Sequence, residues 1–223
     1  MCGIAGLWTH APAADAPVRQ MIRALHHRGP DSNAVWAPPD GTPALGHARL
    51  AIVDLSEAGR QPMVSRSGRY VVVYNGEIYN HLELRDALSG PVAWRGHSDT
   101  ETLLEAVEQW GFERALQKCV GMFAMALWDR QSRALLLARD RMGEKPLYYG
   151  RSARGFAFAS ELKALRLVPG LDFTLDDAAL RDYVRVGYVA SPRSAYRGIA
   201  KLPPGTMLRI ADPAGALPEP LPY

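Results

Sequence analysis

Short apolar stretches, each bounded by glycine, proline or polar residues, recur along the chain. They are rich in Val, Ile and aromatic residues, which favour β-strands, and several are apolar at successive positions. This pattern predicts strands over residues 3–8, 44–54, 69–80, 122–129, 133–140, 145–150, 155–160 and the end of 201–210. The spacing of the strands between residues 122 and 160 is typical of antiparallel sheets.

A second pattern, with apolar residues three or four positions apart, indicates helices. In residues 17–29 it places Val18, Met21, Ile22 and Leu25 on one face, and Gly29 with the following proline ends the segment. Similar reasoning predicts helices over 81–88, 98–111, 161–168 and 175–187. The helix over 98–111 has two candidate N-caps, Ser98 and Asp99.

Strands outnumber helices, and several strands are apolar on both faces. An α+β fold is therefore expected, in which stacked sheets are covered by helices. We expect one domain over residues 1–210. Residues 211–223 are rich in Pro and Ala and are predicted to be a linker.

Composition narrows the function classes. The chain has 223 residues, of which 48% are hydrophobic and 22% charged, as in ordinary soluble proteins. No apolar run approaches the ~20 residues that a membrane helix needs, and residues 1–20 do not resemble a signal peptide. A cytoplasmic protein without a membrane partner is expected. The formal charge is +3, and the 22 arginines are scattered, whereas nucleic-acid binders usually cluster basic residues.

The two cysteines, Cys2 and Cys119, form neither a disulfide framework nor a metal-ligand spacing, and the six histidines add no metal motif. Cys119 lies in an apolar segment and is expected to be a buried, inert side chain. A redox sensor would need a resolving cysteine, which a buried Cys119 does not supply.

Cys2 follows the initiator Met directly. Removal of Met1 would give Cys2 a free α-amine, a group whose pKa of roughly 7.7–8.0 suits a general base near neutral pH. A thiol nucleophile and its base would then share one residue. A cysteine at this position is by itself a weak signal, because many such residues have no function.

Nine segments strengthen the interpretation of Cys2 as a nucleophile. They occur in this order along the chain: CGIAG (2–6), HRGPDS (27–32), GHARLAIVD (46–54), YNGEIYN (74–80), SDTET (98–102), GMFAMALWD (121–129), RDRMGEKPLYYG (139–150), FASELKAL (158–165) and KLPPGTML (201–208). Together they resemble the glutaminase domain of the glutamine-hydrolysing asparagine synthetase family, a class II glutamine amidotransferase with an N-terminal nucleophile. The resemblance covers almost the whole chain.

The resemblance implies a four-layer αββα sandwich of two antiparallel sheets. It also implies hydrolysis of L-glutamine to glutamate and ammonia through a cysteinyl thioester. Cys2 would be the nucleophile and its α-amine the general base. The Asn75 side chain and the Gly76 N–H would form the oxyanion hole, and no cofactor or metal is expected for this domain. Taken alone, an Asn-Gly pair is typical of a hairpin turn between strands, and the two interpretations are compatible because a turn can also present an N–H.

The same resemblance assigns the remaining substrate-binding residues. Arg49 would bind the α-carboxylate of glutamine and Asp99 its α-ammonium, while Glu77 and the backbone around Val53 would line the pocket, together with Asn75 and Gly76. Without the resemblance, Arg49 would be interpreted as an edge-strand residue, Asp99 as a helix cap and Glu77 as a solvated charge. His26, His27, His47 and His97 lie beside motifs and are expected to have packing or hydrogen-bond roles.

The family continues into a synthetase domain that uses ATP and Mg²⁺, and its pyrophosphate-binding loop is not found here. We expect a piece of a longer protein, or a free-standing glutaminase that serves a synthetase in trans; a homodimer is a further expectation. The acceptor of the ammonia, aspartate or another carboxylate, would be selected by the synthetase. The alternative function is a scaffold domain that keeps the fold and docks its partner without catalysis.

Overall fold

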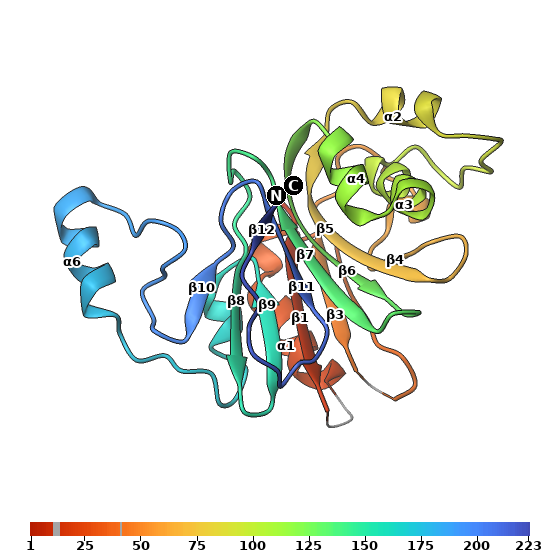
Figure 1. Ribbon diagram of the computed structural model, residues 1–223. Helices are drawn as coiled ribbons and strands as arrows, with labels where there is room; N and C mark the ends of the chain where they lie inside the picture. The colour runs from red at the N-terminus through yellow and green to blue at the C-terminus, as the bar shows by residue number, and fades with distance from the viewer. Residues whose placement is uncertain (11–13, 41) are drawn as a thin grey trace.

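Two six-stranded antiparallel sheets lie face to face, with helices on their outer surfaces (Figure 1). This computed structural model describes residues 1–10, 14–40 and 42–223. The arrangement confirms the expected α+β fold and its four αββα layers.

The first sheet has the strand order β10-β8-β9-β1-β3-β2. Its strands are β1 (Gly3–Thr9), β2 (Ser32–Trp36), β3 (Ala44–Arg49), β8 (Tyr148–Ser152), β9 (Gly155–Ala159) and β10 (Ile199–Lys201). β1 is paired on both sides, with β3 and with β9. The start of the chain, which would otherwise fray, is therefore held in the middle of a sheet.

The second sheet has the order β12-β11-β7-β6-β5-β4. Its strands are β4 (Met63–Val64), β5 (Tyr70–Ile78), β6 (Gly121–Asp129), β7 (Ala134–Arg139), β11 (Thr206–Ile210) and β12 (Leu221–Pro222). β5 pairs with β6 along its whole length, but β4 covers only Val71 and Val72 on the other side. The second half of β5 therefore has one edge without a neighbouring strand.

The helices are α1 (Asp15–Ala24), α2 (His81–Ala87), α3 (Asp99–Trp110), α4 (Phe112–Lys118), α5 (Leu162–Leu165) and α6 (Asp177–Val186), with short 3₁₀ turns η1 (His26–Arg28) and η2 (Glu57–Gly59). α1 and α5 pack on the first sheet, and α2, α3 and α4 cover the second. α6 projects from the sandwich (Figure 1).

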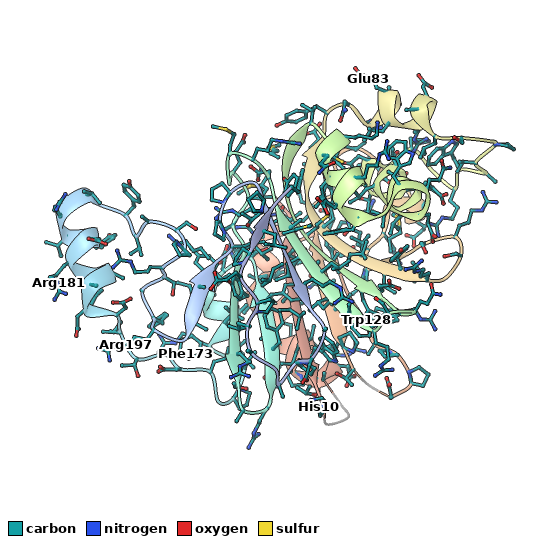
Figure 2. All side chains as sticks on the ribbon, in the orientation of Figure 1. His10, Glu83, Trp128, Phe173, Arg181 and Arg197 are labelled. Atoms are coloured by element: carbon teal, nitrogen blue, oxygen red, sulfur yellow. The ribbon has the colours of Figure 1, made fainter. Side chains whose placement is uncertain are left out.

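Apolar side chains fill the space between the sheets and between each sheet and its helices (Figure 2). Trp8 and Trp128 meet edge to face across the central layer, with ring centroids 4.9 Å apart. Val18, Met21 and Ile22 are buried on one face of α1, as their spacing predicts.

Several boundaries differ from those expected. The strand predicted over 44–54 ends at Arg49. Residues beyond it leave the sheet, and Ile52 and Val53 are exposed in a loop although their residue types favour strands. The sequence pattern does not predict four of the short elements, because they lack a clear spacing of apolar residues: β2, β4, β10 and α4.

The domain boundary at residue 210 remains a prediction. The end of the predicted linker contacts the second sheet: Leu221–Pro222 pairs with β11, and the Tyr223 hydroxyl donates to the Arg139 carbonyl over 3.0 Å. In the described part of the chain, no helix is long and apolar enough to cross a bilayer.

Candidate active site

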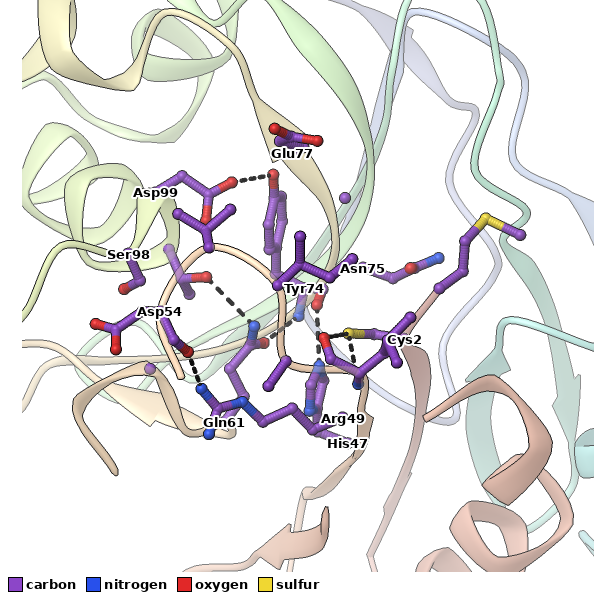
Figure 3. A pocket seen from close by; sticks show the side chains of 18 of the residues that line it. Cys2, His47, Arg49, Asp54, Gln61, Tyr74, Asn75, Glu77, Ser98 and Asp99 are labelled. Carbon is purple, nitrogen blue, oxygen red and sulfur yellow. Dashed lines mark hydrogen bonds between the residues drawn. The ribbon is translucent and has the colours of Figure 1, made fainter. Parts of the chain in front are cut away.

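One cavity of about 100 Å³ is lined by residues from both sheets and from α3 (Figure 3). A water molecule needs roughly 10–15 Å³ of such space, so the cavity has room for a small molecule. The lining includes all seven residues that the sequence singled out: Cys2, Arg49, Val53, Asn75, Gly76, Glu77 and Asp99. Tertiary structure thus brings together groups that lie up to 97 positions apart.

Cys2 immediately precedes β1 and is half-buried. Its Sγ atom lies 3.4 Å from the Leu50 nitrogen and 3.5 Å from the Leu50 carbonyl oxygen. Burial raises the pKa of the thiol, although the hydrogen bond with Leu50 and nearby positive charges offset part of this effect. Because the thiolate is the nucleophile, such a thiol needs a base to remove its proton.

Whether the α-nitrogen of Cys2 can act as this base depends on whether Met1 is removed. Met1 also lines the cavity. With Met1 attached, the nitrogen of Cys2 belongs to a peptide bond and has no basic lone pair. After its removal, the same nitrogen would be an amine within the residue that carries the thiol.

The open edge of β5 presents a row of backbone N–H groups. In the ladder with β6, the N–H groups of Tyr74, Gly76 and Ile78 point away from β6, because hydrogen-bonded and non-bonded positions alternate. The Tyr74 N–H donates to Gln61 Oε1 over 2.6 Å and the Ile78 N–H to Asp99 Oδ2 over 2.9 Å. Between them, the Gly76 N–H has no partner among the described residues.

Asn75 adds a second unpaired donor. Its side chain is 1% exposed, and its Nδ2 group is buried without a hydrogen-bond partner in the described structure. An unsatisfied buried polar group costs about 1–3 kcal/mol, which is a reason to expect that a ligand completes it. The two donors suit a developing oxyanion. The hairpin-turn alternative for Asn75-Gly76 is wrong, because both residues lie within β5.

Gly76 is required by close packing of the strands. A Cβ atom at this position would lie 2.3 Å from the Met122 carbonyl oxygen. Any larger residue would therefore displace β5 from β6.

Asp99 begins α3 but does not cap it. The N-cap is Ser98, whose Oγ accepts from the Glu101 N–H over 3.2 Å. The buried Asp99 carboxylate instead accepts at Oδ2 from the Tyr74 hydroxyl over 2.8 Å and from Ile78, while Oδ1 accepts no hydrogen bond within the described residues. Burial, reinforced by the Asp99 charge, raises the pKa of Tyr74 well above its usual value, so the phenol stays protonated and donates.

Arg49 is buried at the end of β3 and holds the loop that follows. Its Nη1 donates to the Ser56 carbonyl, and its Nη2 donates to the carbonyls of Asp54 and Ser56. A guanidinium has five N–H donors, so Nε–H and one Nη1–H remain for a ligand. Glu77 lines the cavity half-buried and forms no ion pair with another described residue, and Val53 is exposed in the loop.

Two further polar residues shape the cavity. Gln61 joins the β5 edge to α3, since its Nε2 also donates to Thr100 Oγ1 over 3.3 Å. No sequence signal identified Gln61, which lies outside the recognised segments. His47 donates from Nε2 to the Tyr74 carbonyl over 3.1 Å, and burial lowers its pKa to about 4, so the ring is neutral near pH 7.

No cluster of three or more His, Cys, Asp or Glu side chains among the described residues is arranged to hold a metal ion. The cavity therefore offers a thiol, hydrogen-bond donors, a cation and an anion. This set can bind a small zwitterion and present its side chain to a nucleophile.

Comparison with known proteins supports the same conclusion. Residues 1–218 match a family model described as a glutamine amidotransferase domain. A Mycobacterium tuberculosis protein, named as a candidate glutamine-hydrolyzing asparagine synthetase, is 40% identical over 94% of this chain and 35% of its own length. Asparagine synthetase [glutamine-hydrolyzing] 3 of Bacillus subtilis is 36% identical over 95% of this chain and 35% of its own.

Among solved structures, glutamine phosphoribosylpyrophosphate amidotransferase from B. subtilis, complexed with ADP and GMP, has the same fold. Its TM-score is 0.72 at 21% identity, over 94% of this chain and 47% of that one. The chain spans about a third of the length of the curated relatives it matches. The fold and the family match together show that this chain belongs to the glutamine amidotransferase domain family.

Proposed function

We propose that this domain hydrolyses L-glutamine to glutamate and ammonia once Met1 has been removed. The observation that carries the proposal is the Cys2 thiol in one cavity with two unpaired donors, Asn75 Nδ2 and the Gly76 N–H. The family match supports the same chemistry.

In the proposed reaction, the α-amine of Cys2 takes the thiol proton, and Sγ attacks the side-chain amide carbon of glutamine. Asn75 and Gly76 donate to the oxyanion that forms. The α-ammonium then returns its proton to the amide nitrogen, and the C–N bond breaks to release ammonia and leave the thioester. A water molecule, deprotonated by the same amine, attacks the thioester and releases glutamate with the regenerated thiol.

Substrate recognition follows from the two charged groups. A free N–H donor of Arg49 can pair with the α-carboxylate, and the unoccupied Oδ1 of Asp99 can accept from the α-ammonium. Glu77 and the loop around Val53 would complete the walls. Because the side chain of Arg49 already holds residues 54–56, substrate binding and the position of this loop would be coupled.

The ammonia would pass to an ATP- and Mg²⁺-dependent synthetase, either fused to this domain or acting in trans. The names of the curated relatives support asparagine synthesis as the overall reaction. No residue of this chain is assigned to ATP or Mg²⁺ binding. A homodimer is compatible with this scheme and requires no further residue of the site.

Intact-mass measurement tests the proposal. The purified protein is weighed before and after treatment with 6-diazo-5-oxo-norleucine, a glutamine-like electrophile. Loss of the Met1 mass and a single adduct that maps to Cys2 are expected. A chain that lacks Met1 and forms no adduct would support the scaffold alternative.

A further inference from the structure

The backbone of the nucleophilic residue is held by a side chain from another part of the chain. The Cys2 carbonyl oxygen accepts from Arg28 Nε over 2.9 Å. Arg28 ends η1, and its side chain is only 9% exposed. The contact fixes a residue at the start of the chain, where backbones otherwise fray.

Arg28 is held in turn by Glu161. The Nη1 group of Arg28 donates to Glu161 Oε1 over 2.9 Å. The carboxylate also accepts from His27 Nε2 at 3.0 Å and contacts Lys163 Nζ at 3.3 Å. Burial acts to raise the pKa of Glu161, but the hydrogen bonds from these three partners lower it overall, so the group is ionised near neutral pH.

The residue before Glu161 contacts the same strand. Ser160 Oγ accepts from the Ile4 N–H over 3.0 Å, and the Ser160 N–H donates to the Ile4 carbonyl over 2.9 Å. Residues 160–161 therefore hold the start of β1 at two points: directly at Ile4 and, through Arg28, at Cys2.

This geometry matters for the orientation of the thiol. Cys2 lies before the first ladder pair of β1, Gly3 with Ala48, so the sheet does not fix its carbonyl. The peptide group that follows Cys2 includes the Cα atom of Cys2, so a hydrogen bond to its carbonyl fixes the point from which both the nitrogen and the side chain of Cys2 extend. Misplacement of a reacting group by about 1 Å can cost roughly 10²-fold in rate.

We propose that Glu161 is a positioning residue for the nucleophile: by holding Arg28 against the Cys2 carbonyl, it aims the Cys2 thiol and α-nitrogen at the substrate. This inference rests on the proposed glutaminase function for its catalytic consequence, but the physical link between Glu161 and Cys2 can be tested separately. Glu161 itself does not line the cavity, so it touches no substrate.

The kinetic test compares Glu161→Ala and Glu161→Gln with the matched control Lys163→Ala. Lys163 is another partner of the same carboxylate, and its hydrogen-bond and ion-pair partners among the described residues, Glu161 and His27, include neither Arg28 nor Cys2. Glu161→Ala should lower kcat for glutamine hydrolysis at least about ten-fold. It should change KM by less than about three-fold, because Arg49 and Asp99 would still bind the substrate. Glu161→Gln should lie between, because its amide oxygen can still accept from Arg28, and Lys163→Ala should match the unsubstituted protein.

The second measurement is hydrogen–deuterium exchange of the peptide that contains residues 2–8, read by mass spectrometry. Loss of the link should speed its exchange roughly five-fold in Glu161→Ala and leave it unchanged in Lys163→Ala. Should Glu161→Ala fail to fold, Glu161→Gln carries both measurements.

The two measurements separate the proposals. Unchanged exchange in the Glu161 variants would overturn the positioning role, whatever the activity. Faster exchange with normal kcat would overturn it as well, because the thiol would then not depend on the link. Faster exchange in a protein that never hydrolyses glutamine would support the link between Glu161 and Cys2 and reject the glutaminase function.

Discussion

The main-chain N–H of Ile78 donates to Oδ2 of Asp99 over 2.9 Å, which joins the open edge of β5 to the first turn of α3. β5 carries Asn75 and Gly76, and α3 carries the acid proposed for the substrate ammonium. One hydrogen bond therefore links the two parts of the cavity that would contact opposite ends of glutamine. Such a link would hold the two parts at a fixed separation and so favour ligands of one length.

Replacement of the proposed nucleophile gives the first prediction. Cys2→Ala should reduce glutamine hydrolysis at least about 10³-fold, because no other group of the cavity can form a thioester. The matched control is Cys119→Ala, whose thiol lies in the core beside α3 and has a pKa raised to about 12 by burial. The control should cost about 1 kcal/mol of stability and keep kcat. Ammonia release and thermal unfolding measure the two effects.

The unpaired amide of Asn75 gives the second prediction. Asn75→Ala should lower kcat about 10²- to 10³-fold with little change in KM, as expected for a donor used in the transition state. Its unfolding free energy should fall little, because the lost Nδ2 group has no hydrogen-bond partner in the part of the chain that the structure describes. A large loss of stability with normal kcat would contradict the oxyanion role.

Asn80 provides a contrast for that measurement. Its side chain donates to the Lys118 carbonyl and accepts from the Val120 N–H, outside the cavity. Asn80→Ala should lower stability by about 1 kcal/mol and leave kcat unchanged.

Removal of the Asp99 charge gives the third prediction. In Asp99→Asn the side-chain oxygen can still accept from Tyr74 and Ile78, so the fold should persist. The attraction for an α-ammonium would be lost, and KM for glutamine should rise at least about ten-fold. Steady-state kinetics on glutamine provide the measurement, and an unchanged KM would exclude Asp99 from substrate binding.

The buried His47 gives a prediction for pH dependence. Burial lowers its pKa from 6.5 to about 4, so between these values the unfolded chain binds more protons at this residue than the folded chain. The contribution of His47 to stability is therefore fully present above pH 6.5 and is lost as the pH falls toward 4. His47→Gln should flatten this part of the curve of unfolding free energy against pH. Denaturant titrations at a series of pH values would reveal the difference, and parallel curves for both proteins would refute it.

Patterns within the sequence predict the strand-rich α+β class and most of the long elements, and the family resemblance identifies seven residues of the cavity. Burial imposes a regular spacing on apolar residues, which reveals strands and helices. The family resemblance rests on contiguous segments such as YNGEIYN, which can be recognised without knowledge of the structure. The same patterns wrongly predict that residues 50–54 belong to a strand. Their apolar side chains favour a strand, whereas Arg49 holds the following segment as a loop.

The tertiary structure is needed to learn which side chains and backbone groups contact one another and which donors remain unpaired. The Gly76 N–H is available because β4 ends before reaching it, and Asp99 is free of capping because Ser98 fills that role. Gln61 contacts α3 and Glu161 contacts Arg28, and both contacts join residues that are distant in the sequence. Sheet register and layer packing set these distances, and neither is encoded in any local pattern, because each depends on how segments far apart in the chain bury their apolar faces against one another.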